Sequence, residues 1–352
     1  KIIVFESDDW GATRMYDKHA YKSLLNKGCP VDNCPYNKND RIENNEDLSI
    51  LAETLLRHKD RLGKPAKFTL NNIVANPDFD KIKASHFQKY HYEDFQTTLS
   101  RYNDTNQVMD LYQEGIQNEI FQSQLHGREH VNVELWLKRL QAKEQRFLDA
   151  FNHNMFTVTG SGIVSGRRDN LDTYGNSKIQ GDYHNYTTNI KEAQDLFFKT
   201  WGFYSTTFIA PCYVWHPNLE KILANNKIKG IQGTHVQRVP LKTSFQVRRK
   251  YHFTGQKNSL GQVYLNRNVM FEPTENSVTD VVDETLRQIN LSFKYKKPAI
   301  ISSHRVNYIG SLNPNNRTQN IKKLNHLLKS ITRRWNDVQF MSSDQLINLI
   351  NK

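Results

Sequence analysis

Short apolar stretches alternate with amphipathic helical segments along most of the chain, and this alternation restricts its fold more than any other feature. Leucines recur at helical spacing from Asp47 to Leu62 and from Val133 to Phe151, and Pro217 opens a further helix. Alternating strands and helices form a parallel sheet, either open or closed into a barrel. The expected strands are Ile2–Glu6, 66–74, 119–125, 154–160, 206–210, 228–233 and 298–303.

The length of 352 residues fits either one large α/β barrel or two ordinary domains. Because neither an internal repeat nor a low-complexity linker divides the chain, we expect a single domain over residues 1–352. Three stretches interrupt the alternation and are expected as insertions at the barrel ends, namely 103–118, 165–188 and 239–273.

Basic residues outnumber acidic ones by 48 to 36, which gives a formal net charge of +12. This excess favours an anionic partner such as nucleic acid, acidic lipid or an acidic glycan, whereas scattered lysines that only maintain solubility are the alternative. The segment KTSFQVRRKYHF, inside the third expected insertion, interleaves basic and aromatic residues. Such a pattern is typical of nucleic-acid or acidic-glycan surfaces, and also of a solvated strand.

The three cysteines, Cys29, Cys34 and Cys212, are an odd number in a large chain. They favour a reduced protein over a disulfide framework, although a pair between Cys29 and Cys34 stays open. The cytoplasm is therefore favoured over the periplasm or the cell envelope. No apolar run is long enough to span a membrane, and a signal peptide removed before Lys1 is left open.

Catalytic residues of parallel α/β folds lie at the carboxyl ends of the strands, so the residues after each expected strand are the candidates. Asp8 and Asp9 follow the first strand. Two adjacent carboxylates suit a base paired with a metal ligand, because like charges raise one of the two pKa values. The alternative is a helix N-cap, in which the same residues bind free backbone amides.

The segment LHGREHVN follows the third strand and places His126 and His130 four residues apart. Neutral imidazoles at this spacing bind one divalent metal. The segment also matches the H-x-x-E-H signature of inverted zinc peptidases, with Glu129 as its acid. That alternative requires the motif to lie inside a helix, whereas Gly127 and the apolar residues before it favour a strand followed by a loop.

Two further strand ends carry candidate residues. In TTFIAPCYVWHP, Pro211 fixes a turn beside Tyr213 and Trp215, whose aromatic faces suit a sugar ring and equally a packed corner. AIISSHRVNYIG places His304 and Arg305 after the last apolar strand, where a histidine is a candidate general acid or base.

The order of these motifs resembles the polysaccharide deacetylase family, the NodB-like carbohydrate esterases. Asp-Asp comes first, then His-x-x-x-His, an apolar-Pro-aromatic turn and Ser-His, up to about Tyr308, and VQFMSSDQLINLI resembles the strand and helix that close such a barrel. The resemblance implies a distorted (β/α) barrel of about seven parallel strands. It also implies metal-dependent hydrolysis of an N-acetyl or O-acetyl group on a bacterial surface glycan or its precursor.

The resemblance gives each candidate residue a role. Asp9, His126 and His130 would bind a divalent metal, with Zn²⁺ preferred, Asp8 would be the base, and His304 would protonate the leaving amine. A backbone N–H near Cys212 would stabilise the oxyanion. A carbohydrate, rather than nucleic acid, is the expected partner. The residues expected to contact it are Trp10, Arg128, Pro211, Cys212, Tyr213, Trp215 and Arg305.

The chain departs from the family pattern near the proton-transfer residues. Ile209 stands where the family has an arginine that holds the catalytic aspartate, and Arg128, Arg267 and Arg305 are the candidate replacements. The family's acid that orients the rim histidine has no clear counterpart, and Glu272 is the candidate for it. These departures leave a third function open, a catalytically impaired deacetylase fold that binds an acidic glycan without cleaving it.

Overall fold

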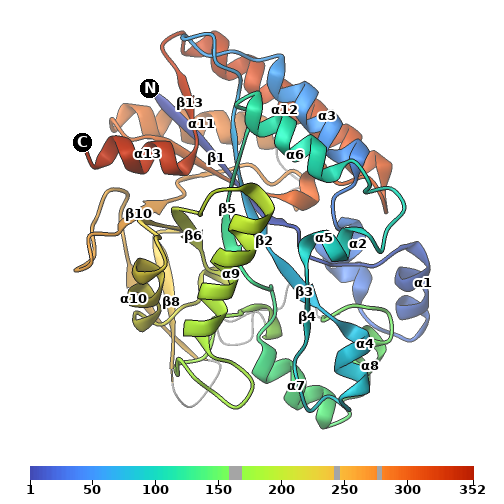
Figure 1. Ribbon diagram of the computed structural model, residues 1–352. Coiled ribbons are helices and arrows are strands. Elements are labelled where there is room, and N and C mark those ends of the chain that lie inside the picture. The colour runs from blue at the N-terminus through green and yellow to red at the C-terminus, as the bar shows by residue number, and fades with distance from the viewer. Residues whose placement is uncertain (158–168, 242–245, 276–279) are drawn as a thin grey trace.

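A nine-stranded sheet, parallel at every pairing, forms the centre of the protein in a computed structural model (Figure 1). The structure describes residues 1–157, 169–241, 246–275 and 280–352. The strand order is β10-β7-β6-β5-β2-β1-β12-β11, and β13 pairs with the start of β1. The strands are β1 (Ile2–Trp10), β2 (Phe68–Ile73), β5 (Phe121–Gly127), β6 (Thr207–Ile209), β7 (Gly230–Gly233), β10 (Val263–Asn266), β11 (Val269–Met270), β12 (Ala299–His304) and β13 (Gln339–Met341).

The sheet curls into a distorted barrel whose two outermost strands are joined by the chain itself. Only Arg267 and Asn268 separate β10 from β11. The backbone N–H of Arg267 donates to the carbonyl oxygen of Gly233 on β7, and that of Asn268 donates to Ile300 on β12. The segment β10–β11 therefore acts as one bent strand between β7 and β12. This bent strand is the seventh strand position around the barrel, and the other six are β1, β2, β5, β6, β7 and β12. The predicted fold class is therefore confirmed.

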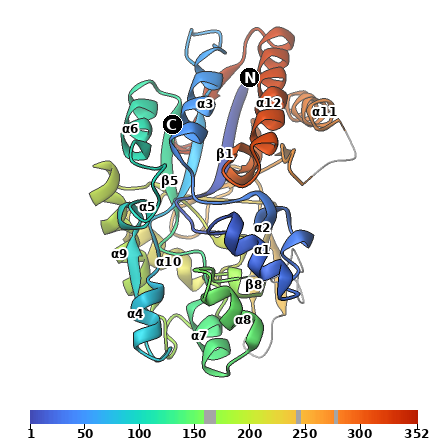
Figure 2. The same cartoon turned by 90° about the vertical axis from the view of Figure 1, so that its right-hand side faces the viewer.

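Helices surround this sheet (Figures 1 and 2). α3, α6, α11 and α12 cover the outside of the strands, whereas α4, α7 and α8 lie beyond the carboxyl ends. α3 begins at a capping box between Asn44 and Asp47, and α9 ends at Gly202 with a φ of 78°. The helices are α1 (Lys18–Asn26), α2 (Pro35–Asn39), α3 (Asn45–Leu56), α4 (Phe79–Ala84), α5 (Phe95–Leu99), α6 (Val108–Gln117), α7 (Val133–Gln141), α8 (Gln145–Phe151), α9 (Tyr186–Trp201), α10 (Asn218–Asn225), α11 (Val281–Lys294), α12 (Pro314–Arg334) and α13 (Ser343–Ile350).

Two small antiparallel pairs extend from the barrel, β3 (Ala75–Pro77) with β4 (Tyr92–Asp94) and β8 (Val236–Pro240) with β9 (Val247–Tyr251). None of the helices in the described ranges is long and apolar enough to cross a membrane. All three cysteines are free thiols, so the pair between Cys29 and Cys34 that the sequence left open does not form.

The side chains of β1 are divided between two environments. Ile3 and Phe5 pack in the main core with residues of the outer helices, whereas Val4 lies in a second apolar cluster with Val263 and Ile300. α13 closes this second cluster at the amino-terminal end of the barrel. Since successive strand residues alternate, the inward-facing positions after Val4 are those of two carboxylates, Glu6 and Asp8.

Six of the seven expected strands are present, as β1, β2, β5, β6, β7 and β12. The strand expected at 154–160 is wrong for residues 154–157, which lie in no strand, and residues 158–160 lie outside the described ranges. The helix expected over 133–151 is two helices, because the chain turns at Lys143, whose φ is 55°. Two of the stretches expected as insertions contain elements of the barrel. Residues 103–118 contain α6, and residues 239–273 contain the sheet strands β10 and β11.

The contact between α13 and β7 provides a test of how the barrel is closed. A Cβ on Gly230 would lie 1.7 Å from Cδ1 of Ile347, so Gly230→Ala should lower the free energy of unfolding by about 1–3 kcal/mol. Ile347→Val removes that Cδ1 atom and should cost about 0.5–1.5 kcal/mol alone. Urea unfolding should show that the double variant loses less than the sum of the two, and strict additivity would contradict the contact.

Candidate active site

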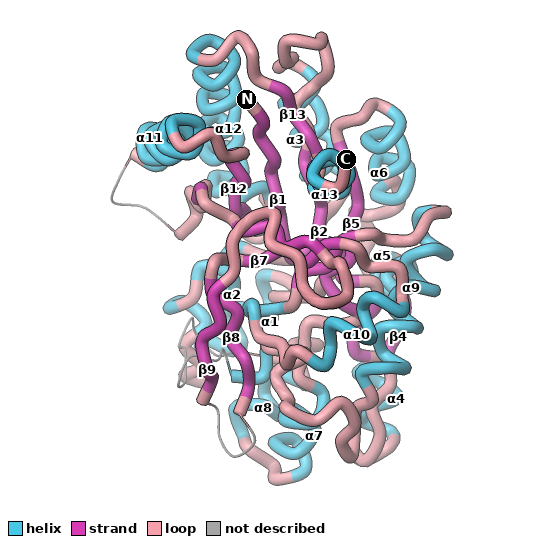
Figure 3. The backbone as a smooth tube through the Cα atoms, turned by 90° about the vertical axis from the view of Figure 1, so that its left-hand side faces the viewer, coloured by secondary structure: helices cyan, strands magenta, loops and turns pink. Residues whose placement is uncertain are grey.

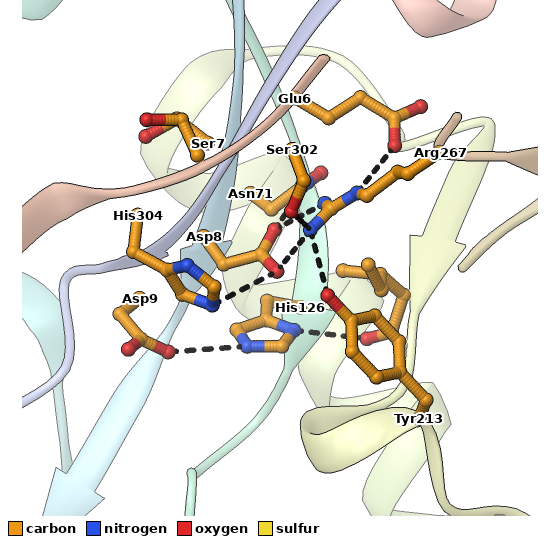
Figure 4. A network of polar contacts seen from close by, with 12 residues as sticks. Glu6, Ser7, Asp8, Asp9, Asn71, His126, Tyr213, Arg267, Ser302 and His304 are labelled. Carbon is orange, nitrogen blue, oxygen red and sulfur yellow. Dashed lines mark hydrogen bonds and ion pairs between the residues drawn. The ribbon is translucent and has the colours of Figure 1, made fainter. Parts of the chain in front are cut away.

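Asp8 and Asp9 both reach the carboxyl end of the barrel because β1 is irregular there (Figure 4). The pairing of β1 with β2 shifts its register between Ser7 and Trp10, and Asp9 has a φ of 73°. In a regular strand these neighbours would point to opposite faces, and a bulge with a left-handed residue redirects one of them. The N-cap alternative is wrong, because the next helix, α1, is capped by Asp17.

Asp9, His126 and His130 form a compact cluster of possible metal ligands, with one ligand atom from each lying within 4.8 Å of the others. Oδ1 of Asp9 is 3.4 Å from Nε2 of His126 and 3.2 Å from Nε2 of His130. Nδ1 of His126 lies 3.0 Å from the carbonyl oxygen of Ile209. A proton on that Nδ1 leaves Nε2 free to bind a metal, which is the usual arrangement of metal-binding histidines.

The protonation states of the cluster fit a cation. Burial opposes ionisation of Asp9, but Arg14 and His130 together hold its pKa well below the usual range. Nη2 of Arg14 donates to Oδ2 of Asp9 at 3.2 Å, so Oδ1 faces the two imidazoles. Burial lowers the pKa of His130 to about 4, although Asp9 acts in the opposite direction. One carboxylate and two imidazoles are a ligand set that zinc and similar ions bind.

Asp8 is held by Arg267, from the joint between β10 and β11 (Figure 4). The two terminal nitrogens of this guanidinium donate to the two carboxylate oxygens of Asp8 at 2.6 and 2.7 Å, and its Nε donates to Glu6 at 2.8 Å. Asn71 adds a hydrogen bond of 2.8 Å to Asp8. Burial acts to raise the pKa of Asp8, but Arg267, together with the charges of His126 and His304, outweighs it, so the net shift is downward. Among the three candidate replacements for the family arginine, Arg267 is the one that contacts Asp8.

His304 lies at the end of β12 with its two ring nitrogens in different environments. Nδ1 is 2.7 Å from Glu272, and Nε2 is 3.8 Å from Oδ2 of Asp8. Asn307 donates to the second oxygen of Glu272 at 2.8 Å, which fixes this carboxylate. Burial lowers the pKa of His304, but Glu272 and Asp8 raise it to about 9. Glu272 therefore occupies the place of the orienting acid that the sequence suggested.

These groups line one cavity of about 140 Å³. Asp8, Asp9, His126, His130 and His304 share it with Glu272, Cys212, Tyr213 and Arg238. Cys212 and Tyr213 both have positive φ values, 57° and 58°, in the turn that Pro211 begins. Pro211 itself is buried and does not line the cavity. That the backbone near Cys212 stabilises an oxyanion remains a prediction.

The expectation of substrate contact is wrong for Pro211 and for three further buried residues, Trp10, Trp215 and Arg305. The indole N–H of Trp10 donates to Ser7, and that of Trp215 donates to Glu220. The side chain of Arg305 is fully buried and forms ion pairs with Asp40 and Glu43. Each of these polar groups is paired inside the protein, and none of the three side chains lines the cavity.

Arg128 and Glu129 point away from the cluster, although they lie between its two histidines in sequence. Both line a separate cavity of about 500 Å³. Arg128 pairs with Glu129 and Glu192 and lies over the ring of Tyr92, 4.2 Å from its centroid. Arg128 is therefore not the replacement for the family arginine at Asp8, and its contact with the substrate stays a prediction. His126 lies in β5, one residue before its end, and His130 follows in a loop, so the helix required by the peptidase motif is absent from this described segment.

Sequence reasoning missed Arg14 and Asn71, which hold Asp9 and Asp8. Arg14 also lies 3.9 Å from Asp40 in a buried ion pair. Asn71 lies on an expected strand, and the alternation of that strand limits its side chain to one of two faces without indicating which one points toward Asp8. Arg14 follows Asp9 by five residues in an irregular segment, where no periodicity indicates its direction.

No protein-family model matches the chain, and no curated protein matches its sequence. Similar solved structures include a putative polysaccharide deacetylase from Mycobacterium smegmatis, with 9% identity, a TM-score of 0.46 and coverage of 99% of this chain and 90% of that one. A 4-alpha-glucanotransferase from Thermococcus litoralis has 10% identity, a TM-score of 0.46 and coverage of 99% and 40%, so this chain spans 40% of that protein. A family 4 acetyl xylan esterase from Clostridium thermocellum, in complex with a cobalt ion, has 10% identity, a TM-score of 0.35 and coverage of 99% and 91%. The likeness is one of fold and carries no inference about the reaction.

The pair of His304 and Glu272 should make stability depend on pH. Because the pKa of His304 rises from 6.5 to about 9 on folding, the pair stabilises the fold fully below pH 6.5 and is lost as the pH rises through 9. Urea unfolding across this range should show a smaller decrease for Glu272→Gln than for the wild type. His304→Gln serves as the control, since it should show the same reduced decrease. Parallel curves for all three proteins would contradict the prediction.

Proposed function

We propose that the protein is a metal-dependent deacetylase that hydrolyses N-acetyl, or O-acetyl, groups of a bacterial surface glycan or its precursor. One observation carries this proposal. A cluster of one carboxylate and two imidazoles shares a cavity with a second carboxylate, held by an arginine, and with a histidine, held by a glutamate. Metal-assisted hydrolysis with a separate base and acid needs this set of groups within one small space.

Asp9, His126 and His130 are the residues that would hold the metal. Two nitrogen ligands and one oxygen ligand favour zinc, and three protein ligands leave a position open for chemistry. When bound, the ion would supply Lewis acidity to this end of the cavity. Arg14 and the carbonyl oxygen of Ile209 fix the directions of Asp9 and His126, so these ligands are held in place by the surrounding protein.

The proton transfers are assigned to Asp8 and His304. As water attacks the acetyl carbon, Oδ2 of Asp8 accepts a proton from it; when the carbon–nitrogen bond breaks, Nε2 of His304 donates a proton to the departing amine. The products are acetate and a free amino sugar. The raised pKa of His304 supports its role as the acid, because the ring is protonated at neutral pH. Arg267 supports the base by keeping Asp8 ionised despite its burial.

The two alternative functions have less support. A zinc peptidase would use Glu129 as its base, but this side chain accepts a hydrogen bond from Asn189 and pairs with Arg128, outside the cavity. The catalytically impaired glycan-binding protein was suggested by the missing arginine at Ile209. Arg267 supplies a guanidinium to Asp8 from another strand, which removes that reason.

Metal analysis tests the ligand set directly. The purified protein should bind about one divalent ion per chain, and His126→Gln should weaken its zinc affinity by roughly 100-fold or more. His19 lies exposed on α1, so His19→Gln is a matched control that should bind like the wild type. Equal zinc binding by both variants in isothermal titration would contradict the assignment.

Acetate release from a panel of acetylated oligosaccharides tests the reaction. Asp8→Asn should lower turnover by about 100- to 10,000-fold, the usual contribution of a general base, while zinc stays bound. Glu129→Gln removes the acid that a peptidase would need and should keep most of the deacetylase activity. The reverse pattern, or peptide cleavage that depends on Glu129, would contradict the proposal.

A further inference from the structure

We infer that the substrate is an anionic glycan and that it lies along one face of the β8–β9 hairpin, next to the catalytic cavity. This inference rests on the proposed function and adds the substrate's charge and its path. Figure 3 shows β8 and β9 as a separate antiparallel pair beside the main sheet. The hairpin therefore presents a surface that the barrel itself does not need for its sheet.

The register of the hairpin defines the face. Arg238 on β8 pairs with Arg249 on β9, and Val236 pairs with Tyr251. Directly opposite residues of an antiparallel pair share a face, and so do residues two apart on one strand. Arg238, Arg249 and Tyr251 therefore lie on the same face, whereas Arg248 belongs to the opposite one. Arg249 and Tyr251 are exposed, Tyr251 by 64%.

Arg238 connects this face to the catalytic cavity. Its side chain lines the cavity that also contains Asp8, His126 and His304, and its Nη1 donates to the carbonyl oxygen of Cys212 at 3.2 Å. A chain of sugars with one residue in the cavity can thus continue past Arg238 toward Arg249. The cavity of about 140 Å³ accommodates only a small part of a polymer, so the remainder must lie outside it.

No carboxylate in the described part of the chain pairs with the arginines of this face. Two like charges directly opposite each other on neighbouring strands destabilise a sheet. Every Asp and Glu of the chain lies in the described ranges, and none forms an ion pair with Arg238 or Arg249 there. An anionic group placed between the two guanidinium groups would remove this repulsion, and carboxylate, sulfate and phosphate groups all match their fork of donors.

Basic residues on the opposite face of the hairpin act on two neighbouring histidines. Burial lowers the pKa of His216, and the charge of Arg248 lowers it further. Burial and the charge of Lys250 act in the same direction on the pKa of His252. Tyr251 adds an exposed aromatic ring beside Arg249, which suits packing against the apolar face of a sugar.

Binding of two matched oligosaccharides tests the inference. Hyaluronan oligosaccharides alternate N-acetylglucosamine with an anionic sugar, whereas chitin oligosaccharides contain N-acetylglucosamine alone. In the Asp8→Asn background, which slows turnover, hyaluronan should bind more tightly than chitin, and its binding should weaken as salt is added. Arg249→Gln should weaken hyaluronan binding roughly fivefold and leave chitin binding unchanged.

Arg248→Gln is the control, since it removes the same charge from the opposite face one residue away. It should change hyaluronan binding less than twofold. Three results would overturn the inference. The first is an equal effect of both substitutions on hyaluronan binding, and the second is no preference for hyaluronan over chitin. The third is that single-stranded DNA binds more tightly than hyaluronan and that Arg249→Gln weakens the binding of both to the same extent. The inference and the proposed function can fail separately. If the protein releases acetate from chitin and does not prefer hyaluronan, only the inference about the anionic substrate is refuted. If hyaluronan binding depends on Arg249 but no glycan releases acetate, only the proposed deacetylation is refuted.

Discussion

Two consecutive residues of a regular strand face opposite sides of a sheet, so Asp8 and Asp9 share one cavity only because β1 leaves regular geometry. The left-handed backbone of Asp9 costs about 1–3 kcal/mol, and the contacts around it must compensate. Glu43 accepts two hydrogen bonds from the N–H of Gly11, and Asn76 accepts one from the N–H of Thr13. The bulge is thus fixed by neighbouring segments, and the positions of both carboxylates depend on it.

Buried charges behind the cavity set the ionisation of these carboxylates. Removing one partner of a buried ion pair costs about 3–5 kcal/mol, so each such pair holds its members in place. Five carboxylates and three arginines are joined in these buried pairs. The carboxylates are Glu6, Asp8, Asp9, Asp40 and Glu43, and the arginines are Arg14, Arg267 and Arg305.

Those features that lie at strand ends were predictable from the sequence, because parallel strands bring their carboxyl ends together. Asp9, His126 and His130 meet for this reason, and so do Asp8 and His304. The joint of the barrel was not predictable, since β10 and β11 have four and two residues and carry no periodicity. Burial of Trp10 and Trp215 was not predictable either, because an aromatic residue after a strand packs in a core as readily as against a sugar.

Arg267 shows why the partner of Asp8 had to be found in space. A guanidinium stabilises the ionised form of a buried carboxylate, and any inward position near it on the barrel wall can supply one. Ile209 contributes its backbone carbonyl oxygen, which orients His126. Glu6 accounts for the position of Arg267. Glu6 faces inward two residues before Asp8, so one guanidinium between them pairs with two buried carboxylates. An arginine at the β10–β11 joint pairs with both Asp8 and Glu6. The sequence around Ile209 could not indicate this position, because the two segments are far apart in the chain.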